Sequence, residues 1–318
     1  MLRKFRIRFF LIIIAVLFTG CIWQTIESNR ELKLLRPPGE LYSVNSHDMH
    51  MYAAGHGDTT IVFVPGSGTP SAYTDFYYLQ SQLQNHARTV SYDHPGFGWS
   101  EPAMSPRTID NIVLELHELF KQANETPPYL LVEHSLASLE VIHYAQRYPD
   151  EVTGIVLLDS GSPEYYADDS ELKYKLLNRT LAGLRRSGIV RALGEADVLL
   201  PFSGEDVRYK RLPEGIQDID IAMYYGKLGN KSNLDVIKHM NENAQTVIDG
   251  GDLADIPLLV ISSESGEDWK QVQRELLKWS NSSQQITIPD SAHYIHWSNQ
   301  DTIRNEIIDM LNQSNLRK

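Results

Sequence analysis

A serine at residue 135 stands where a run of apolar residues gives way to a helical pattern. The run Tyr129–Val132 leads through Glu133 and His134 to Ser135, and apolar residues then recur at helical spacing from Leu136. A buried strand that turns directly into a helix exposes the turn residue at the carboxyl edge of a sheet and aims free N–H groups at it. A serine there can be a nucleophile if a base stands beside it. We therefore interpret Ser135 as the candidate nucleophile.

The residues around this serine depart from the usual turn of this kind. The pattern G-x-S-x-G requires small residues two places before and two places after the serine. Here these places hold Glu133 and Ala137, of which Ala137 is a mild departure. A carboxylate at such a crowded turn must be buried with a hydrogen-bond partner or point to solvent. Glu133 therefore keeps open the alternative that Ser135 only begins a helix, in a protein that binds a ligand without hydrolysing it.

Candidate bases follow the last strand-like segment. His293 comes after the turn Asp290–Ala292, and His296 lies three residues further on. A neutral imidazole is the group that takes a proton from a serine hydroxyl. His134, next to Ser135, is interpreted as a packing residue.

A candidate acid ends another apolar run. Asp159 follows Ile155–Leu158, and only one helix separates this run from Ser135, so the two strands should be neighbours. A carboxylate there would hold the second N–H of the imidazole, although capping of the next turn is an equal alternative. Three other carboxylates, held in reserve, follow the later run Pro257–Ile261: Glu264, Glu267 and Asp268.

Strand-like and helical segments alternate along most of the chain. Strands are expected at 41–44, 50–53, 61–64, 89–92, 129–132, 155–158, 257–261 and 285–288, and helices at 72–83, 109–120 and after 300. This alternation predicts an α/β fold with a mostly parallel sheet covered on both faces. The alternation is lost between residues 160 and 255, where polar helical patterns (172–184 and 234–247) predict an inserted helical lid.

Four motifs, each at the end of a predicted strand, together resemble the α/β-hydrolase superfamily. They are Val64–Gly68, Tyr92–Ser100, the turn at Ser135 and Ala292–His296, and the similarity extends from about Leu41 to the C-terminus. The resemblance implies an eight-stranded sheet and a triad of Ser135, His293 and Asp159. It also implies an oxyanion site made by the backbone amides of Ser67 and Leu136, and no cofactor.

Composition and the N-terminus predict an exported, membrane-tethered protein. The formal net charge of −12 argues against a nucleic-acid partner. Four basic residues in the first eight precede the 15-residue apolar run Phe9–Trp23, as in a secretory signal or an uncleaved anchor. Basic residues before the run predict a cytoplasmic N-terminus and an extracytoplasmic remainder. Cys21, the only cysteine, follows Phe18–Gly20 in a way that resembles a bacterial lipoprotein signal, and it excludes an internal disulfide.

These predictions divide the chain and suggest an activity. Residues 1–27 are expected to be the signal anchor or lipoprotein signal, 28–40 a juxtamembrane connector, 41–159 and 256–318 the hydrolase core, and 160–255 the lid. The predicted function is a serine hydrolase that cleaves a small-molecule ester or amide through an acyl-enzyme, with esterase as the default. A proline-iminopeptidase-like aminopeptidase is an alternative, because acidic lid residues could hold a substrate ammonium: Glu164, Asp168, Asp169, Glu171, Glu195, Glu205 and Asp206. A lid that docks lipid is another, and a metal site is not expected.

Overall fold

The computed structural model describes residues 2–196 and 211–316, and an eight-stranded sheet forms its centre. The strands are β1 (Glu40–Val44), β2 (His47–Ala54), β3 (Thr60–Val64), β4 (Arg88–Tyr92), β5 (Tyr129–His134), β6 (Val152–Leu158), β7 (Leu258–Ser262) and β8 (Ser283–Thr287). Their order across the sheet is β1-β2-β4-β3-β5-β6-β7-β8. β2 is antiparallel to both of its neighbours, and the other pairs are parallel. The expected eight-stranded, mostly parallel sheet is thus confirmed.

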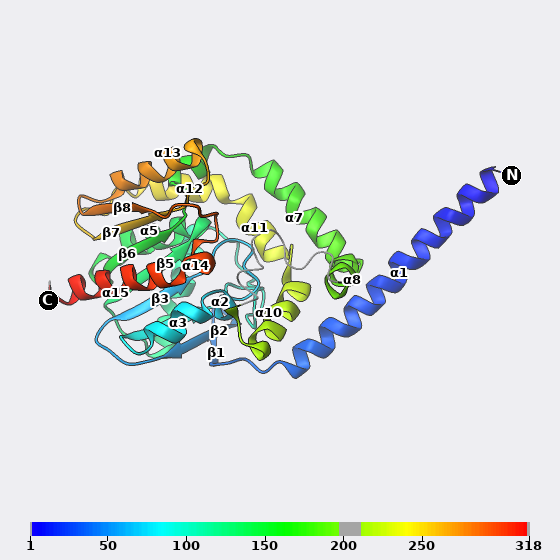
Figure 1. Ribbon diagram of the computed structural model, residues 1–318, viewed down its shortest axis with the longest axis horizontal. Coiled ribbons are helices and arrows are strands. Elements are labelled where there is room, and N and C mark those ends of the chain that lie inside the picture. The colour runs from blue at the N-terminus through cyan, green and yellow to red at the C-terminus, as the bar shows by residue number, and fades with distance from the viewer. Residues whose placement is uncertain (1, 197–210, 317–318) are drawn as a thin grey trace.

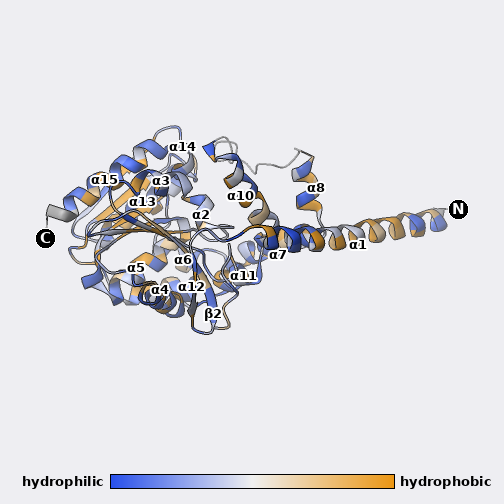
Figure 2. Ribbon diagram, turned by 90° about the horizontal axis from the view of Figure 1, so that it is seen from below, coloured by the Kyte–Doolittle hydropathy of each residue, from blue (hydrophilic) through white to orange (hydrophobic). Residues whose placement is uncertain are grey.

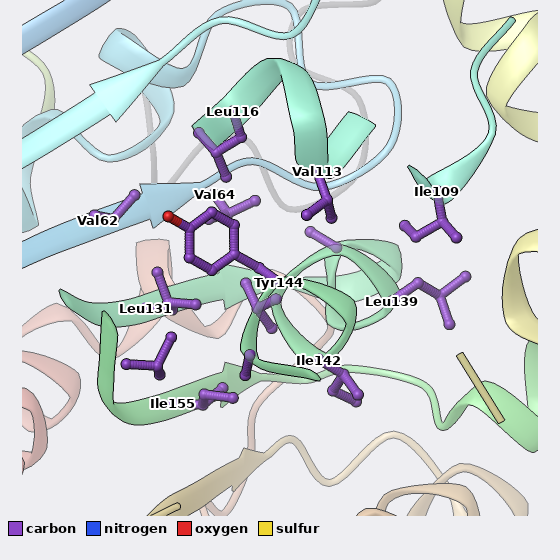
Figure 3. Packing of buried hydrophobic residues seen from close by; sticks show 14 of the residues in the cluster. Val62, Val64, Ile109, Val113, Leu116, Leu131, Leu139, Ile142, Tyr144 and Ile155 are labelled. Carbon is purple, nitrogen blue, oxygen red and sulfur yellow. The ribbon is translucent and has the colours of Figure 1, made fainter. Parts of the chain in front are cut away.

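The central strands are continuous apolar runs because helices cover both faces of the sheet. Every residue of β3, β5 and β7 is buried, whereas the edge strand β8 carries polar, partly exposed residues. Successive side chains in a strand point to opposite faces, so neighbouring residues enter different cores. Leu131 packs beneath helices α4 (Ile109–Ala123) and α5 (Ser138–Arg147), as Figure 3 shows. Leu130 packs on the other face, against α3 (Tyr77–Leu83) and α15 (Gln300–Leu316).

Two segments expected to be single helices are each divided. The segment 72–83 consists of α2 (Ala72–Asp75) and α3, which meet at Phe76. The segment 234–247 consists of α11 (Lys231–Lys238) and α12 (Met240–Asp249), which meet at His239. The ring Nδ1 of His239 lies 2.8 Å from the carbonyl oxygen of Asp235, so the side chain supplies a bond at the break.

An insertion of helices separates β6 from β7, as predicted. Besides α11 and α12, it contains α6 (Pro163–Asp168), α7 (Glu171–Arg186), α8 (Ile189–Glu195) and α10 (Glu214–Lys227). We call residues 163–249 the insertion; residues 197–210 within it lie outside the described part of the chain. In Figure 1, α7, α10 and α11 stand beyond one end of the strands. The last helix, α12, packs into the same core as the sheet and holds this end of the insertion in place.

The N-terminal helix α1 (Leu2–Leu34) is longer than the apolar run that predicted it. The helix includes residues 28–34, so the expected connector begins as helix. Its stretch Arg3–Glu31 is long and apolar enough to cross a membrane, and only 6% of its most apolar window is buried. The helix projects from the rest of the molecule, with apolar residues over much of its projecting part (Figure 2). Its C-terminal part packs against α7 and α10.

Candidate active site

Ser135 forms a sharp turn between β5 and the helical segment that follows it. Its φ of 63° is in the left-handed region, which a non-glycine residue adopts at a cost and mostly where function or packing requires it. The turn lifts the hydroxyl to the carboxyl end of the sheet. There Ser135 Oγ lies 3.0 Å from Nε2 of His293. The structure therefore brings the predicted nucleophile and base into hydrogen-bonding contact.

His293 lies in the loop between β8 and the short helix α14 (Ile295–Ser298). Its Nδ1 is 2.8 Å from Asp159 Oδ2, so one ring nitrogen faces a carboxylate and the other faces the serine hydroxyl. A proton on Nδ1 leaves Nε2 free to accept from the serine. The other candidate base, His296, is buried and lies 3.3 Å from Asp75 Oδ1. The structure thus brings His293, and not His296, to Ser135.

The carboxylate that faces the imidazole belongs to Asp159, which directly follows β6 and is fully buried. Its Oδ1 accepts hydrogen bonds from the Ser263 amide at 2.7 Å and from Gln273 Nε2 at 2.5 Å. Its Oδ2, besides facing His293, accepts from Trp269 Nε1 at 3.1 Å. Burial alone would raise the pKa of Asp159, but hydrogen bonds from His293 and Ser263 lower that pKa below its ordinary value. The carboxyl is therefore ionised at neutral pH.

The three carboxylates held in reserve lie away from the imidazole. Glu264 is exposed and accepts a hydrogen bond from the Asp290 amide at 3.1 Å. Glu267 and Asp268 are exposed in the first turn of helix α13 (Glu267–Glu275). This helix contributes to the site by its other face, which carries two partners of Asp159 that we did not predict, Trp269 and Gln273. The two residues are four apart on one helix, a spacing that places both side chains on the same face, and this was the signal that the sequence offered.

The glutamate beside the nucleophile is accommodated as a neutral group. Glu133 is completely buried, and its carboxyl accepts a hydrogen bond from the hydroxyl of Ser160. Burial raises the pKa of Glu133 well above its ordinary value, although hydrogen bonds from the Ser160 hydroxyl and the Leu158 backbone oppose this rise. The raised pKa favours the protonated carboxyl, and in that form the cost of burying a charge next to the turn is avoided.

Replacing Glu133 with glutamine is expected to stabilise the protein, increasingly so as the pH rises. The stability associated with a raised pKa is fully present below the unfolded value of 4.5 and is lost as pH rises toward the folded value. Over that interval the free energy of unfolding of the parent falls by up to about 1.4 kcal/mol per pH unit, because only the unfolded chain ionises. Glutamine has no such ionisation. Thermal unfolding from pH 4 to pH 8 should show equal Tm values at pH 4 and a growing excess for Glu133→Gln above pH 5. Parallel curves would contradict a neutral Glu133.

The turn after β3 approaches the nucleophile closely. A Cβ atom added at Gly66 would lie 2.9 Å from the ring Nδ1 of His134 and 3.0 Å from its carbonyl oxygen, so only glycine fits there. The next residue, Ser67, donates a hydrogen bond from its hydroxyl to Asn233 Oδ1 at 2.8 Å. Leu136 lies in the first helical turn after Ser135, where backbone N–H groups have no partner within the helix. The two predicted oxyanion residues therefore flank the nucleophile.

A chain of two asparagines connects the insertion to this turn, and the sequence contained no signal for it. Asn233 on α11 donates from Nδ2 to Asn178 Oδ1 at 2.9 Å. Asn178 on α7 donates in turn to the carbonyl oxygens of Gly229 and Asn230. Because both asparagines are buried, these bonds hold the side chain of Ser67 against the insertion.

A cavity of about 790 Å³ lies between the sheet edge and the insertion, and it contains the hydroxyl of Ser135. Aromatic and aliphatic side chains make up much of its wall: Tyr165, Tyr166, Tyr174, Leu177, Leu181, Tyr224, Leu228, Ile237, Met240, Trp269 and Tyr294. The hydroxyl of Tyr166, which also lines the cavity, accepts a hydrogen bond from the Gly161 amide at 3.2 Å. Among the described residues, Asp159 is the only acidic one in the wall, and it already faces His293.

Of the acidic residues expected to bind a substrate ammonium, none that the structure describes lines this cavity. Asp169 bonds to Lys173 and Tyr174, and Glu171 pairs with Lys175. Glu205 and Asp206 lie outside the described residues. Within residues 2–196 and 211–316, no group of three or more His, Cys, Asp or Glu side chains is arranged to hold a metal ion.

Comparison with known proteins connects this geometry to one fold. A family model described as "alpha/beta hydrolase fold" matches residues 59–300. An uncharacterized protein of Bacillus subtilis (strain 168), YbdG, is 24% identical over 249 residues, which cover 78% of this chain and 75% of that protein. Two solved structures have a TM-score of 0.64. The enol-lactonase from Burkholderia xenovorans LB400 is 19% identical and is matched over 86% of this chain and 100% of its own. A thermophilic esterase from Thermogutta terrifontis is 18% identical, with 86% and 98% covered.

Proposed function

The chain belongs to the α/β-hydrolase fold family, and from this premise we propose that it is a serine hydrolase that acts through an acyl-enzyme. The proposal depends on one observation above all. Ser135 Oγ, the imidazole of His293 and the carboxylate of Asp159 lie in a row, with contacts of 3.0 and 2.8 Å. A hydroxyl, a neutral imidazole and a buried carboxylate in this order form a nucleophile, a base and an orienting anion.

The proposed reaction has two stages, acylation of Ser135 and hydrolysis of the acyl-enzyme, and the same three groups act in both. Ser135 Oγ attacks the carbonyl carbon of the substrate while Nε2 of His293 takes the hydroxyl proton. Asp159 stabilises the imidazolium, which then gives the proton to the leaving group as the scissile bond breaks. Water repeats the sequence on the acyl-enzyme and releases the acid. The amides of Ser67 and Leu136 would bind the oxyanion, and each such donor contributes about 3 kcal/mol.

Within this class, the cavity favours an ester with an apolar acyl part. Its wall is aromatic and aliphatic, and none of its described residues supplies a free carboxylate for a substrate ammonium. An aminopeptidase needs such a partner, because a buried unpaired ammonium is costly. We therefore place a carboxylesterase-like activity ahead of an aminopeptidase.

We also infer that α1 tethers the enzyme to a membrane, with the hydrolase part on the extracytoplasmic side. The length, apolar composition and low burial of Arg3–Glu31 support a membrane span, since the helix does not belong to the protein core. The basic residues at its start favour a cytoplasmic N-terminus. Whether a signal peptidase cuts before Cys21 would be decided by the mass of the mature protein.

A fluorophosphonate probe tests the hydrolase proposal directly. The full chain in detergent or nanodiscs is expected to form one covalent adduct, mapped by mass spectrometry to Ser135. A panel of p-nitrophenyl esters and aminoacyl amides should show hydrolysis of the esters, with apolar acyl groups preferred. A folded protein that neither labels nor hydrolyses any member would instead be a non-catalytic binding protein.

A further inference from the structure

The outer face of α7 is both apolar and basic. Four of its leucines are exposed: Leu172 at 74%, Leu176 at 65%, Leu177 at 55% and Leu184 at 37%. The helix also exposes Lys173, which pairs with Asp169, and two arginines, Arg179 and Arg186. The exposed residues of α7 include no acid, although the protein as a whole has a net charge of −12. Surface helices of water-soluble proteins rarely expose so much contiguous apolar area, so we expect a partner to cover this face of α7.

The end of α7 touches the helix that we infer to span the membrane. A Cβ atom added at Gly20 would lie 2.2 Å from the carbonyl oxygen of Ser187, and one added at Gly188 would lie 2.8 Å from the oxygen of Gly20. The two backbones are therefore in direct contact, and Gly20 lies near the end of the apolar part of α1. In Figure 1, α7 lies on the side of the domain from which α1 projects, and it runs across the direction of α1.

Buried polar contacts hold the insertion to α1 just beyond this point. Arg191 on α8 bonds to both carboxylate oxygens of Glu31, at 2.5 and 2.7 Å, and to Gln24 Oε1 at 3.0 Å. Gln24 donates to the carbonyl oxygen of Tyr225 on α10 at 2.7 Å. A bidentate arginine–carboxylate pair fixes orientation as well as distance. The position of α7 relative to α1 is thus defined by the fold.

We propose that α7 is a membrane-contact helix that lies on an anionic lipid surface. If α1 crosses the bilayer, a helix that runs across it beside Gly20 lies along the interface. Exposed leucines there enter the boundary between headgroups and acyl chains, while Arg179 and Arg186 face anionic headgroups. The basic outer face and the anionic lipid are complementary in charge, whereas the acidic remainder of the protein is repelled.

The same helix borders the proposed active site. Leu177 is exposed and also lines the cavity, and Leu181, one turn further, lines it as well. An acyl chain that leaves the bilayer at α7 would meet Leu177 and then the cavity that contains Ser135. This step rests on the proposed hydrolase function. It identifies the substrate class as a membrane-borne ester with a long apolar chain.

The docking of α7 can be measured without any catalytic assay. Leu176→Cys, made in a Cys21→Ser background of the full chain, is labelled with an environment-sensitive fluorophore and reconstituted in nanodiscs. Nitroxide-labelled lipids should quench this probe at least about threefold more than the same probe at Leu114→Cys, on α4. Leu114 is the matched control because it is an exposed leucine of another helix, 41% exposed. Equal quenching at the two positions would overturn the proposal.

A second test varies the charge of the lipid. Quenching at residue 176 should be stronger in nanodiscs that contain phosphatidylglycerol than in pure phosphatidylcholine, and the difference should shrink in high salt. Quenching that does not depend on lipid charge or salt would overturn the anionic part of the proposal.

A double variant separates docking from hydrolysis. Leu172→Glu/Leu176→Glu should retain fluorophosphonate labelling of Ser135 and hydrolysis of a soluble short ester. Its hydrolysis of a long-chain ester embedded in nanodiscs should fall about tenfold, because two exposed leucines that would enter the lipid interface are replaced by charged residues. Leu114→Glu should change neither rate. Unchanged hydrolysis of the embedded ester would refute entry over α7. If no variant labels at all, the hydrolase proposal fails, while the quenching result still decides whether α7 docks.

Discussion

Replacement of Ser135 with alanine is expected to lower kcat for ester hydrolysis by about 10⁵-fold or more and to abolish fluorophosphonate labelling. The reason is that alanine removes the atom that forms the acyl-enzyme, and the remaining base and oxyanion donors then accelerate only a slow attack by water. KM should change little, since the side chain contributes little to ground-state binding. Steady-state kinetics on the preferred p-nitrophenyl ester measures both constants.

A neighbouring serine provides the control for this variant. Ser138 lies one helical turn further, is buried, and donates from its hydroxyl to the carbonyl oxygen of Gly161 at 2.8 Å. Ser138→Ala should lose about 1 kcal/mol of stability with that hydrogen bond and keep kcat within a few-fold. Residual labelling or activity of Ser135→Ala above this background would place the nucleophile elsewhere.

Replacement of Asp159 with asparagine is expected to lower kcat by about 10³- to 10⁴-fold at neutral pH. In the parent all four neighbours of the carboxylate donate to it: Ser263, Trp269, Gln273 and His293. An amide can accept at only one of its two ends. If its NH₂ group faces His293, the ring must carry its proton on Nε2, which can then no longer accept the proton of Ser135. If the amide turns over, its NH₂ group faces two other donors.

The reserve carboxylates supply the matched comparison for this variant. Glu264→Gln and Asp268→Asn should each keep kcat within about twofold, because both side chains are exposed and neither faces the imidazole. Asp159→Asn should also lose the stability that comes from the lowered pKa of Asp159. That stability is present above the ordinary value of 3.8 and is lost as pH falls through the folded value. A large effect at residue 264 or 268 with a small one at 159 would reassign the acid.

Local patterns in the sequence were enough to predict the fold. Apolar runs such as Ile61–Val64 and Ile155–Leu158 became central strands because a strand covered on both faces must be apolar at every position. Helical spacing in 109–120 became α4 because one face of that helix had to meet the core. The breaks at Phe76 and His239 were missed, since such breaks depend on bonds and packing that a short pattern does not carry.

The candidate site was only partly predictable. Placing Ser135 needed one strand and one helix in succession, which are local features. Two choices could not be made from local patterns: His293 against His296, and Asp159 against Glu264. Each depends on which segments meet in space, although they lie more than 100 residues apart in the chain. The state of Glu133 depended on the hydroxyl of Ser160 and on complete burial. A pattern of residue types shows neither the hydrogen-bond partner of a side chain nor how deeply it is buried.

By itself, then, the sequence determined the alternation of strands and helices, the turn at Ser135 and the apolar N-terminal helix, because periodicity and local sterics act over a few residues. Only the tertiary structure decided which imidazole and which carboxylate meet that serine, how Asn233 reaches Ser67, and that α7 touches α1 at Gly20. These are distances between remote segments, and they are set by how the whole sheet and the insertion pack together.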